Sequence, residues 1–173
     1  MREPEKIYQA LTFLSGCFRR APVILCLGSD RITGDCFGPL VGEALVRRHN
    51  AGAFVYGSLQ APVTALTLIE TIAFIKERHP CRPVLAVDAA LGNTRDIGAF
   101  RVFDGGIYPG AAAGKWLPKA GDFSLTAVVA AHSAAGLYGA RLGFVASLAR
   151  TAARAIASSL ESTHGTQRMR HEG

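Results

Sequence analysis

The chain has 173 residues, of which 49% are apolar, and this is enough for one domain with a sizeable core. Its formal net charge is +6, from 19 lysines and arginines against 13 acids. No apolar run approaches the ~20 residues that span a bilayer. Residues 1–18 mix charges of both signs without a sustained apolar stretch, unlike a signal peptide. We therefore expect a cytoplasmic protein with no membrane partner.

The basic residues are spread along the chain. Several fall at predicted helix ends or on polar helix faces, among them Arg47, Arg48 and Arg150, and others lie near the C-terminus. No nucleic-acid motif and no interleaved aromatic residues accompany them. The distribution favours a solvated basic surface, and we expect no nucleic-acid partner.

The four cysteines, at positions 17, 26, 36 and 81, form no CxxC pair. This argues against a zinc site and against a disulfide framework. Cys17 and Cys26 are typical of small core residues.

The first two elements come before residue 48. An apolar stripe at spacings of three and four predicts an amphipathic helix over 4–19, formed by Ile7, Leu11, Leu14 and Phe18. Residues 22–27 then predict a short buried strand, and a helix begins near Gly38. Asp35 lies in the loop between them. In an open α/β sheet, ligands bind at this carboxyl end of the strands.

Strands and helices continue to alternate after this unit. Residues 53–56 predict a second strand, and residues 62–79 predict a helix closed by Pro80. Residues 83–89 predict a third buried strand that ends on Asp88, and 97–106 predict a fourth, with Phe100 and Val102 on its buried face. This alternation predicts a largely parallel sheet with right-handed crossovers.

The last third of the chain begins with a loop rich in glycine and proline, residues 104–122. A long loop inside a compact domain is often functional. Residues 124–131 fit either a strand or the start of a helix. A helix is predicted from 134 to 160, with a buried stripe of Tyr138, Leu142, Val145, Ala149, Ala152 and Ile156. We expect a single α/β domain over 1–162 and a disordered tail over 163–173.

Asp35 and Asp88 are the main catalytic candidates. Both follow apolar strands and would meet at one edge of a parallel sheet. Two carboxylates brought close together cannot both ionise cheaply, so one keeps its proton. One can then activate water while the other protonates a carbonyl oxygen or a leaving amine, which would hydrolyse an amide. The alternative is structural, with Asp35 capping the next helix and Asp88 closing a turn.

The glycine-rich loop offers candidate substrate-binding residues at Gly110, Gly114 and Lys115. Its GAAAGKW segment lacks one residue of the phosphate-loop spacing and has Trp116 in place of the magnesium-binding Ser or Thr. We therefore expect no nucleotide and no other cofactor. Lys115 could bind an anionic group or a substrate carbonyl, or it could be an ordinary exposed lysine.

Two further residues suggest other chemistry. Cys36 adjoins Asp35 and could act as a nucleophile with His132 as its base, although a small buried thiol is the simpler interpretation. His132 could also join Asp35 and Asp88 around a divalent metal ion. The simpler interpretation of His132 is a structural histidine.

Four ordered motifs within residues 20–160 resemble a known family. They are TGDCFGPLVG (33–42), VYGSLQAPV (55–63), VDAALG (87–92), and PGAAAGKWLP followed by GD (109–122). Together they resemble the YyaC-type sporulation proteins, which are related to the spore germination protease and, more distantly, to hydrogenase maturation peptidases. The resemblance implies a phosphorylase/hydrolase-like fold, with three α/β/α layers around a mostly parallel sheet.

The resemblance also bears on the site. The two catalytic aspartates of the germination protease fall on Asp35 and Asp88. In hydrogenase maturation peptidases the corresponding acids bind nickel with a histidine, which His132 matches only loosely. The chain lacks the added segments of the germination protease.

These features lead to three hypotheses. The first is a sporulation-associated, peptidase-like protein that acts on a protein or peptide with Asp35 and Asp88. The second is a non-enzymatic module that binds a peptide or partner in the same cleft during spore formation. The third is a metal-dependent hydrolase, which a chelator would inactivate.

Overall fold

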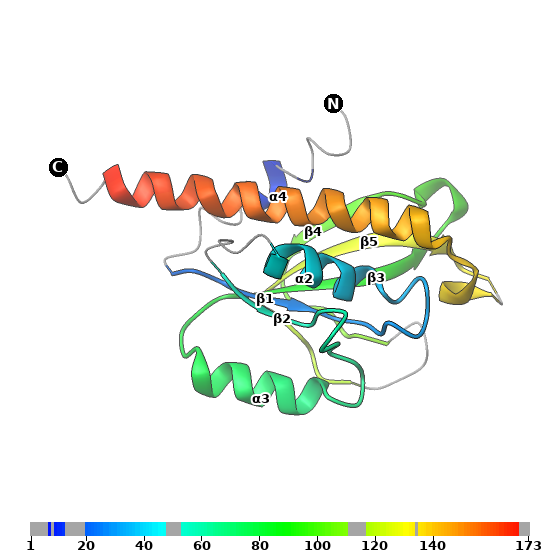
Figure 1. Ribbon diagram of the computed structural model, residues 1–173, viewed down its shortest axis with the longest axis horizontal. Coiled ribbons are helices and arrows are strands. Elements are labelled where there is room, and N and C mark those ends of the chain that lie inside the picture. Colours follow the sequence, from blue (N-terminus) through cyan, green and yellow to red (C-terminus); the bar gives the residue numbers. More distant parts are fainter. Residues whose placement is uncertain are drawn as a thin grey trace.

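The computed structural model of the chain describes residues 7, 9–12, 20–47, 53–110, 117–133 and 135–169, with side chains up to Glu161. Five strands form one sheet in the order β2-β1-β3-β5-β4 (Figure 1). Four of them run parallel: β1 (Val23–Cys26), β2 (Phe54–Tyr56), β3 (Val84–Gly92) and β5 (Phe123–Ala131). The edge strand β4 (Phe100–Asp104) pairs antiparallel with β5. The predicted mostly parallel sheet is confirmed.

Helices cover both faces of this sheet. Helices α2 (Phe37–Arg47) and α4 (Leu142–Met169) pack together over one face, and α3 (Leu68–Arg78) lies on the other (Figure 1). The alternation of side chains along β1 explains both contacts. Ile24 and Cys26 belong to the core under α2 and α4, whereas Val23 and Leu25 belong to the core under α3. The three-layer α/β/α architecture that the family resemblance implied is therefore present.

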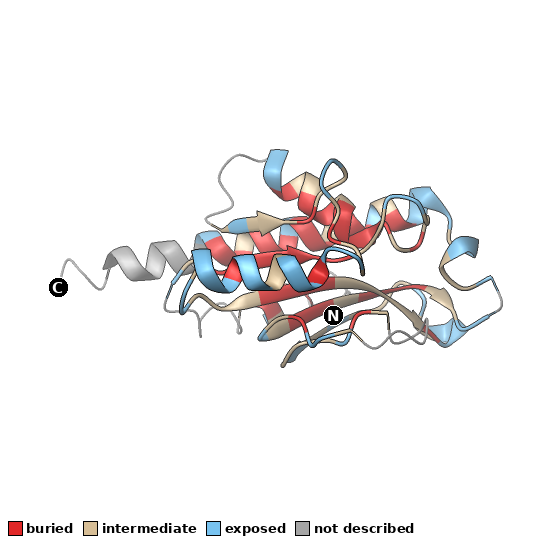
Figure 2. Cartoon of the chain, turned by 90° about the horizontal axis from the view of Figure 1, so that it is seen from below, coloured by how far each residue is buried: buried red, intermediate tan, exposed pale blue. Residues whose placement is uncertain are grey.

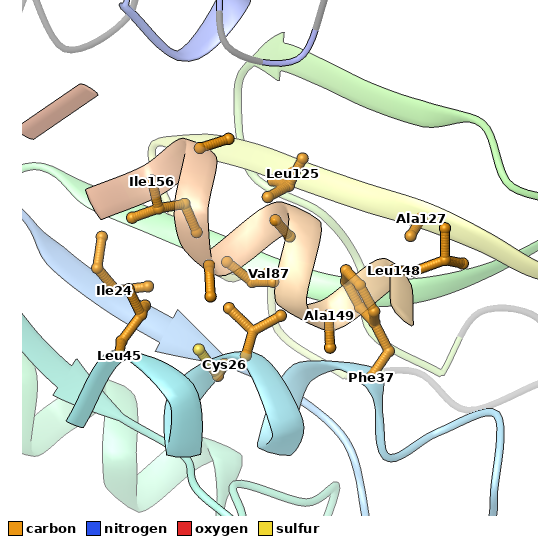
Figure 3. Close-up of a cluster of buried hydrophobic side chains, with 14 of the residues drawn as sticks. Ile24, Cys26, Phe37, Leu45, Val87, Leu125, Ala127, Leu148, Ala149 and Ile156 are labelled. Atoms are coloured by element: carbon orange, nitrogen blue, oxygen red, sulfur yellow. The ribbon is translucent and has the colours of Figure 1, made fainter. Parts of the chain in front are cut away.

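The larger core lies between the sheet and the α2–α4 pair. Figure 3 shows Phe37 of α2 and Ile156 of α4 in this core together with Val87 of β3 and Leu125 of β5. All four side chains are almost fully buried. Figure 2 shows the same division along each helix, with buried residues toward the sheet and exposed residues on the outer side. Burial of large apolar side chains is the main force that fixes these layers.

The predicted helix over 134–160 starts later than its pattern indicated. Residues 136–139 form a short 3-10 turn, η3 (Gly136–Gly139), and α4 begins only at Leu142. Tyr138 and Leu142 are therefore 75% and 59% exposed, and their assignment to the buried stripe was wrong. The other four members, Val145, Ala149, Ala152 and Ile156, are buried as predicted. The helix continues to Met169, so the boundary predicted at residue 162 falls inside it.

Two other segments differ from the predictions or settle an open question. Helix α3 begins at Leu68 rather than near residue 62, because Val63 forms an isolated bridge with Leu27 of the sheet. Its buried residues are Leu68 and Ile75. The ambiguous segment 124–131 lies in strand β5. Within the described residues, no helix combines the length and the apolar character needed to cross a membrane.

Candidate functional site

The candidate site lies at the topological switch point of the sheet, where successive strands are added on opposite sides of β1. From β1 the chain passes to β2 on one side and then crosses back to β3 on the other side of β1. The carboxyl ends of β1 and β3 flank this switch point, which is the usual ligand position in an open α/β sheet and which we call the crevice. Asp35 follows β1, and Asp88 belongs to β3.

Asp88 lies inside β3, which continues to Gly92, so the prediction that the strand ends at Asp88 was wrong. Strand β3 is longer because it keeps pairing with β5 after β1 has ended. The last residue of β1, Cys26, pairs with Val87, so Asp88 is the first residue of β3 beyond this edge of β1. Its partner in β5 is Thr126. Asp88 still lies at the edge of the sheet where β1 ends, as the prediction of a site at the carboxyl end of the strands requires.

The loop that carries Asp35 is fixed by backbone contacts. The Ser29 N–H donates to the Asp35 carbonyl oxygen at 3.2 Å, and the Gly34 N–H donates to the carbonyl oxygen of Leu137 in η3 at 2.9 Å. Gly28 has a φ of +132°, and a Cβ atom there would lie only 2.0 Å from the Asp35 carbonyl oxygen. Glycine at position 28 thus lets the end of β1 approach the Asp35 backbone closely.

The two acids interact electrostatically. Burial, and in second place the negative charge of Asp35, raise the pKa of Asp88 from its ordinary value of 3.8 to about 8. One hydrogen bond opposes this shift: the Ala89 N–H donates to Asp88 Oδ1 at 2.8 Å. Near neutral pH the Asp88 carboxyl therefore holds its proton beside a second carboxylate. This is the arrangement of a carboxylic acid and a carboxylate that acid–base hydrolysis needs.

The base of the glycine-rich loop packs on the same strand as Asp88. Ile107 and Ala120 bridge across this base, and both belong to the core that includes Ala86. A Cβ atom on Gly121 would lie 2.8 Å from the Ala86 Cβ atom. Since Ala86 and Asp88 are two residues apart on β3, their side chains share one face of the sheet. The loop is thus anchored on the α3 side of β3, two residues before Asp88.

The predicted substrate-binding residues of this loop are described only in part. Gly110 is partly buried and has a φ of +71°, a conformation that favours glycine. Gly114 and Lys115 lie outside the described residues.

Cys36 has the properties of a structural thiol. Its side chain is buried, its Sγ atom donates to the Thr33 carbonyl oxygen at 2.9 Å, and burial raises its pKa. A protonated, buried thiol is a poor nucleophile. The interpretation of Cys36 as a small buried residue is therefore confirmed.

His132 lies just after β5 and is exposed, with its N–H bonded to the Gly92 carbonyl oxygen at 2.9 Å. In the described part of the chain, no three His, Cys, Asp or Glu side chains form a group that could hold a metal ion. The structure therefore does not bring His132 together with Asp35 and Asp88 as a ligand set.

Two features of the site were not anticipated. The first is Thr126, which pairs with Asp88 across β3 and β5, because segment 124–131 could not be assigned to a strand from its pattern. The second is the contact between Gly34 and Leu137, which packs η3 on the Asp35 loop. Gly34 was the sequence signal for the second contact, because a Cβ atom there would lie 2.6 Å from the Leu137 carbonyl oxygen.

Comparisons with known proteins identify the family of the chain. The family described as "Protein of unknown function (DUF1256)" matches residues 1–155. The "Uncharacterized protein YyaC" of Bacillus subtilis (strain 168) is 40% identical over 125 residues, which are 70% of this chain and 61% of that relative. The chain thus spans less than two thirds of the length of the relative. No solved structure matches the chain significantly. With nine-tenths of its length inside the family match, the chain belongs to the DUF1256 family.

Proposed function

We propose that this protein hydrolyses amide bonds in a peptide or protein, with Asp35 and Asp88 as its acid–base pair. The observation that carries the proposal is the electrostatic coupling of these two acids in the crevice between β1 and β3. A carboxyl that keeps its proton to about pH 8 beside an ionised partner can supply an acid and a base at once.

The proposed reaction uses both protonation states. The Asp35 carboxylate takes a proton from a water molecule, whose oxygen bonds to the amide carbon. The Asp88 carboxyl gives its proton to the carbonyl oxygen as negative charge develops there. The carbon–nitrogen bond then breaks, and the amine leaves with the proton held by Asp35. The carbonyl oxygen returns its proton to Asp88, so both groups regain their starting states.

The loop and the motifs support a peptide as the substrate. The glycine-rich loop is anchored at Gly121 against Ala86, two residues before Asp88 on β3, so an extended chain bound along β3 would contact the base of the loop. In this proposal Lys115 orients the substrate carbonyl. The motifs around Asp35 and Asp88 resemble those of the germination protease, and this resemblance supports both the peptidase chemistry and a role in spore formation.

The proposal is tested by incubating the purified chain with a mixture of fluorogenic peptides. Asp35→Asn and Asp88→Asn should each lower turnover by a factor of about 10² to 10⁴. Asp104→Asn is the matched control, because Asp104 is exposed at the end of edge strand β4 and outside the crevice. Full activity in either crevice variant would contradict the proposal. Loss of turnover on adding a chelator would favour the metal-dependent hydrolase instead.

A further inference from the structure

A second cavity lies at the opposite edge of the sheet, where the parallel strands begin. Its volume is about 720 Å³, within the range of small-molecule sites. It lies between the start of β3 at Val84, the start of β5 at Phe123 and the C-terminal end of α3 at Lys76. Asp88 is four residues farther along β3 than Val84, about 13 Å by the rise of a strand. Neither Asp35 nor Asp88 lines this cavity.

The side chains that line this cavity carry an excess of positive charge. We call the cavity the basic pocket; its basic residues are Arg20, Lys76, His79, Arg82 and Lys119. Asp122 is the acid among its lining residues, and its Oδ2 atom already accepts the Val84 N–H at 2.9 Å. Within the described part of the chain, Arg20, Lys76 and Lys119 form no ion pair. Most of the positive charge in the pocket is thus left unbalanced.

The dipole of α3 explains only part of this charge. Basic residues in the last turn of a helix interact favourably with its carbonyl end, which accounts for Lys76 and Arg78. Arg20, Arg82 and Lys119 come from three other segments of the chain and do not belong to that helix. Their convergence on one cavity therefore needs another explanation.

One wall of the basic pocket is held rigidly. The Arg82 guanidinium donates to the Ala21 carbonyl oxygen at 2.8 Å and lies 4.8 Å from the centre of the Phe54 ring. That ring stacks on His79 with 4.1 Å between ring centres, and His79 Nε2 is 2.7 Å from the Tyr56 hydroxyl. A cation fixed in this way loses little side-chain entropy when it binds a ligand.

The same wall shows the effect of the positive charge on a neighbouring group. Burial, followed by the charges of Arg82 and Arg78, lowers the pKa of His79. An anion bound in the pocket would oppose this repulsion and would favour the charged imidazole. The pKa of His79 should therefore rise when an anion binds in the basic pocket.

We propose that the basic pocket binds a phosphorylated small molecule. Arginine and lysine side chains are the residues that most often bind phosphate oxygens, the arginine through its planar fork of donors. Arg20, Arg82 and Lys119 would hold the phosphate. The partly exposed apolar side chains of the pocket, Ile72, Val84 and Phe123, would contact the organic part.

The binding test compares phenyl phosphate with inorganic phosphate, by calorimetry at constant ionic strength. Phenyl phosphate should bind more tightly, because its ring covers the apolar side chains of the pocket. Equal affinities would overturn the assignment to an organic phosphate and would identify free phosphate as the ligand. Absence of binding for both up to 10 mM, or tighter binding of an acidic peptide, would overturn the proposal as a whole.

The location is tested with a double variant. Arg20→Gln with Lys119→Gln should weaken phenyl phosphate binding at least tenfold, since each substitution removes a charge-assisted hydrogen bond to the phosphate. Arg150→Gln with Arg154→Gln removes the same charge from exposed positions on α4, on the other face of the sheet, and should change the affinity less than twofold. Equal weakening by both double variants would show a non-specific charge effect and would contradict the proposal.

Proton NMR of His79 gives an independent readout. Saturating phenyl phosphate should raise the pKa of His79, and the double variant of Arg20 and Lys119 should lose this shift. An unchanged His79 titration at saturation would place the ligand elsewhere and would overturn the site. Because none of these measurements depends on Asp35 or Asp88, failure of the basic pocket and failure of the proposed hydrolysis are distinguishable.

Discussion

Asp35 and Asp88 are 53 positions apart in the sequence, yet they lie close enough for the negative charge of Asp35 to raise the pKa of Asp88. The relationship follows from the topology. Strand β1 ends at Cys26 beside Val87, so the loop after β1 and the next residue of β3 share one edge of the sheet. Gly28 then allows the Asp35 backbone to approach the end of β1.

The first prediction concerns the pH dependence of amide hydrolysis. Asp88 must be protonated to act as the acid, and its pKa lies at about 8. The turnover rate should therefore fall above pH 8 as Asp88 loses its proton. Initial rates between pH 5 and 10, measured at saturating peptide, check this. A rate that stays constant to pH 10 would show that Asp88 is not the acid.

The second prediction concerns stability. Because the pKa of Asp88 is raised to about 8 in the folded state and is near 4 when unfolded, the native state binds more protons between these pH values. The free energy of unfolding should therefore fall as pH rises from 4 to 8, at a slope of at most about 1.4 kcal/mol per pH unit from this group. Asp88→Asn has no titrating carboxyl at this position. Its free energy of unfolding should therefore fall less than that of the wild type as pH rises. Urea unfolding at pH 4.5, 6 and 7.5 measures the difference, and parallel curves for the two proteins would refute it.

The third prediction concerns the close approach of Gly28 to Asp35. Gly28→Ala should lower the free energy of unfolding by about 3 kcal/mol, since it combines a φ of +132° with a clash against the Asp35 carbonyl oxygen. Gly143→Ala in α4 is the control, because a Cβ atom there meets nothing within 4 Å. The control should stay within about 1 kcal/mol of the wild type. Equal effects of the two substitutions in urea unfolding would be inconsistent with this packing.

The fourth prediction distinguishes a water molecule activated by Asp35 from the Cys36 thiol as the nucleophile. Cys36→Ala should leave peptide turnover within about twofold of the wild type, because the Cys36 thiol is buried, bonded to the Thr33 carbonyl oxygen and not an activated thiolate. Turnover is measured alongside the unfolding midpoint, to separate a folding defect from a chemical one. If the variant folded normally but lost its activity, the cysteine mechanism would replace the aspartate pair.

The sequence predicted the parts of the fold that depend on local periodicity. Strands β1, β2, β3 and β4 and helix α2 were found close to their observed positions, because their apolar spacing matches a strand or a helix. The start of α4 was misplaced, since the pattern continues through Tyr138 although the chain folds into η3 there. The spacing of apolar residues does not indicate where the chain leaves the helical conformation. Here it does so at η3, where Leu137 packs against Gly34.

The candidate site was predicted in outline only. The carboxyl-end rule identified Asp35 and Asp88, but their electrostatic coupling depends on where β1 stops relative to β3. That register is set by strand pairing between distant segments, which one sequence does not reveal. The same limit applies to the basic pocket, because His79 follows helix α3 whereas its partners Phe54 and Tyr56 belong to strand β2. Its contacts with Phe54 and Tyr56 join segments more than 20 residues apart.

The most direct test of the acid pair is a carbon-13 NMR titration of the aspartate carboxyl groups in the wild type and in Asp35→Asn. We expect the Asp88 carboxyl to titrate near pH 8 in the wild type, and at lower pH once the charge of Asp35 is removed. An Asp88 pKa near 4, or one that is the same in both proteins, would contradict the shared acid–base site.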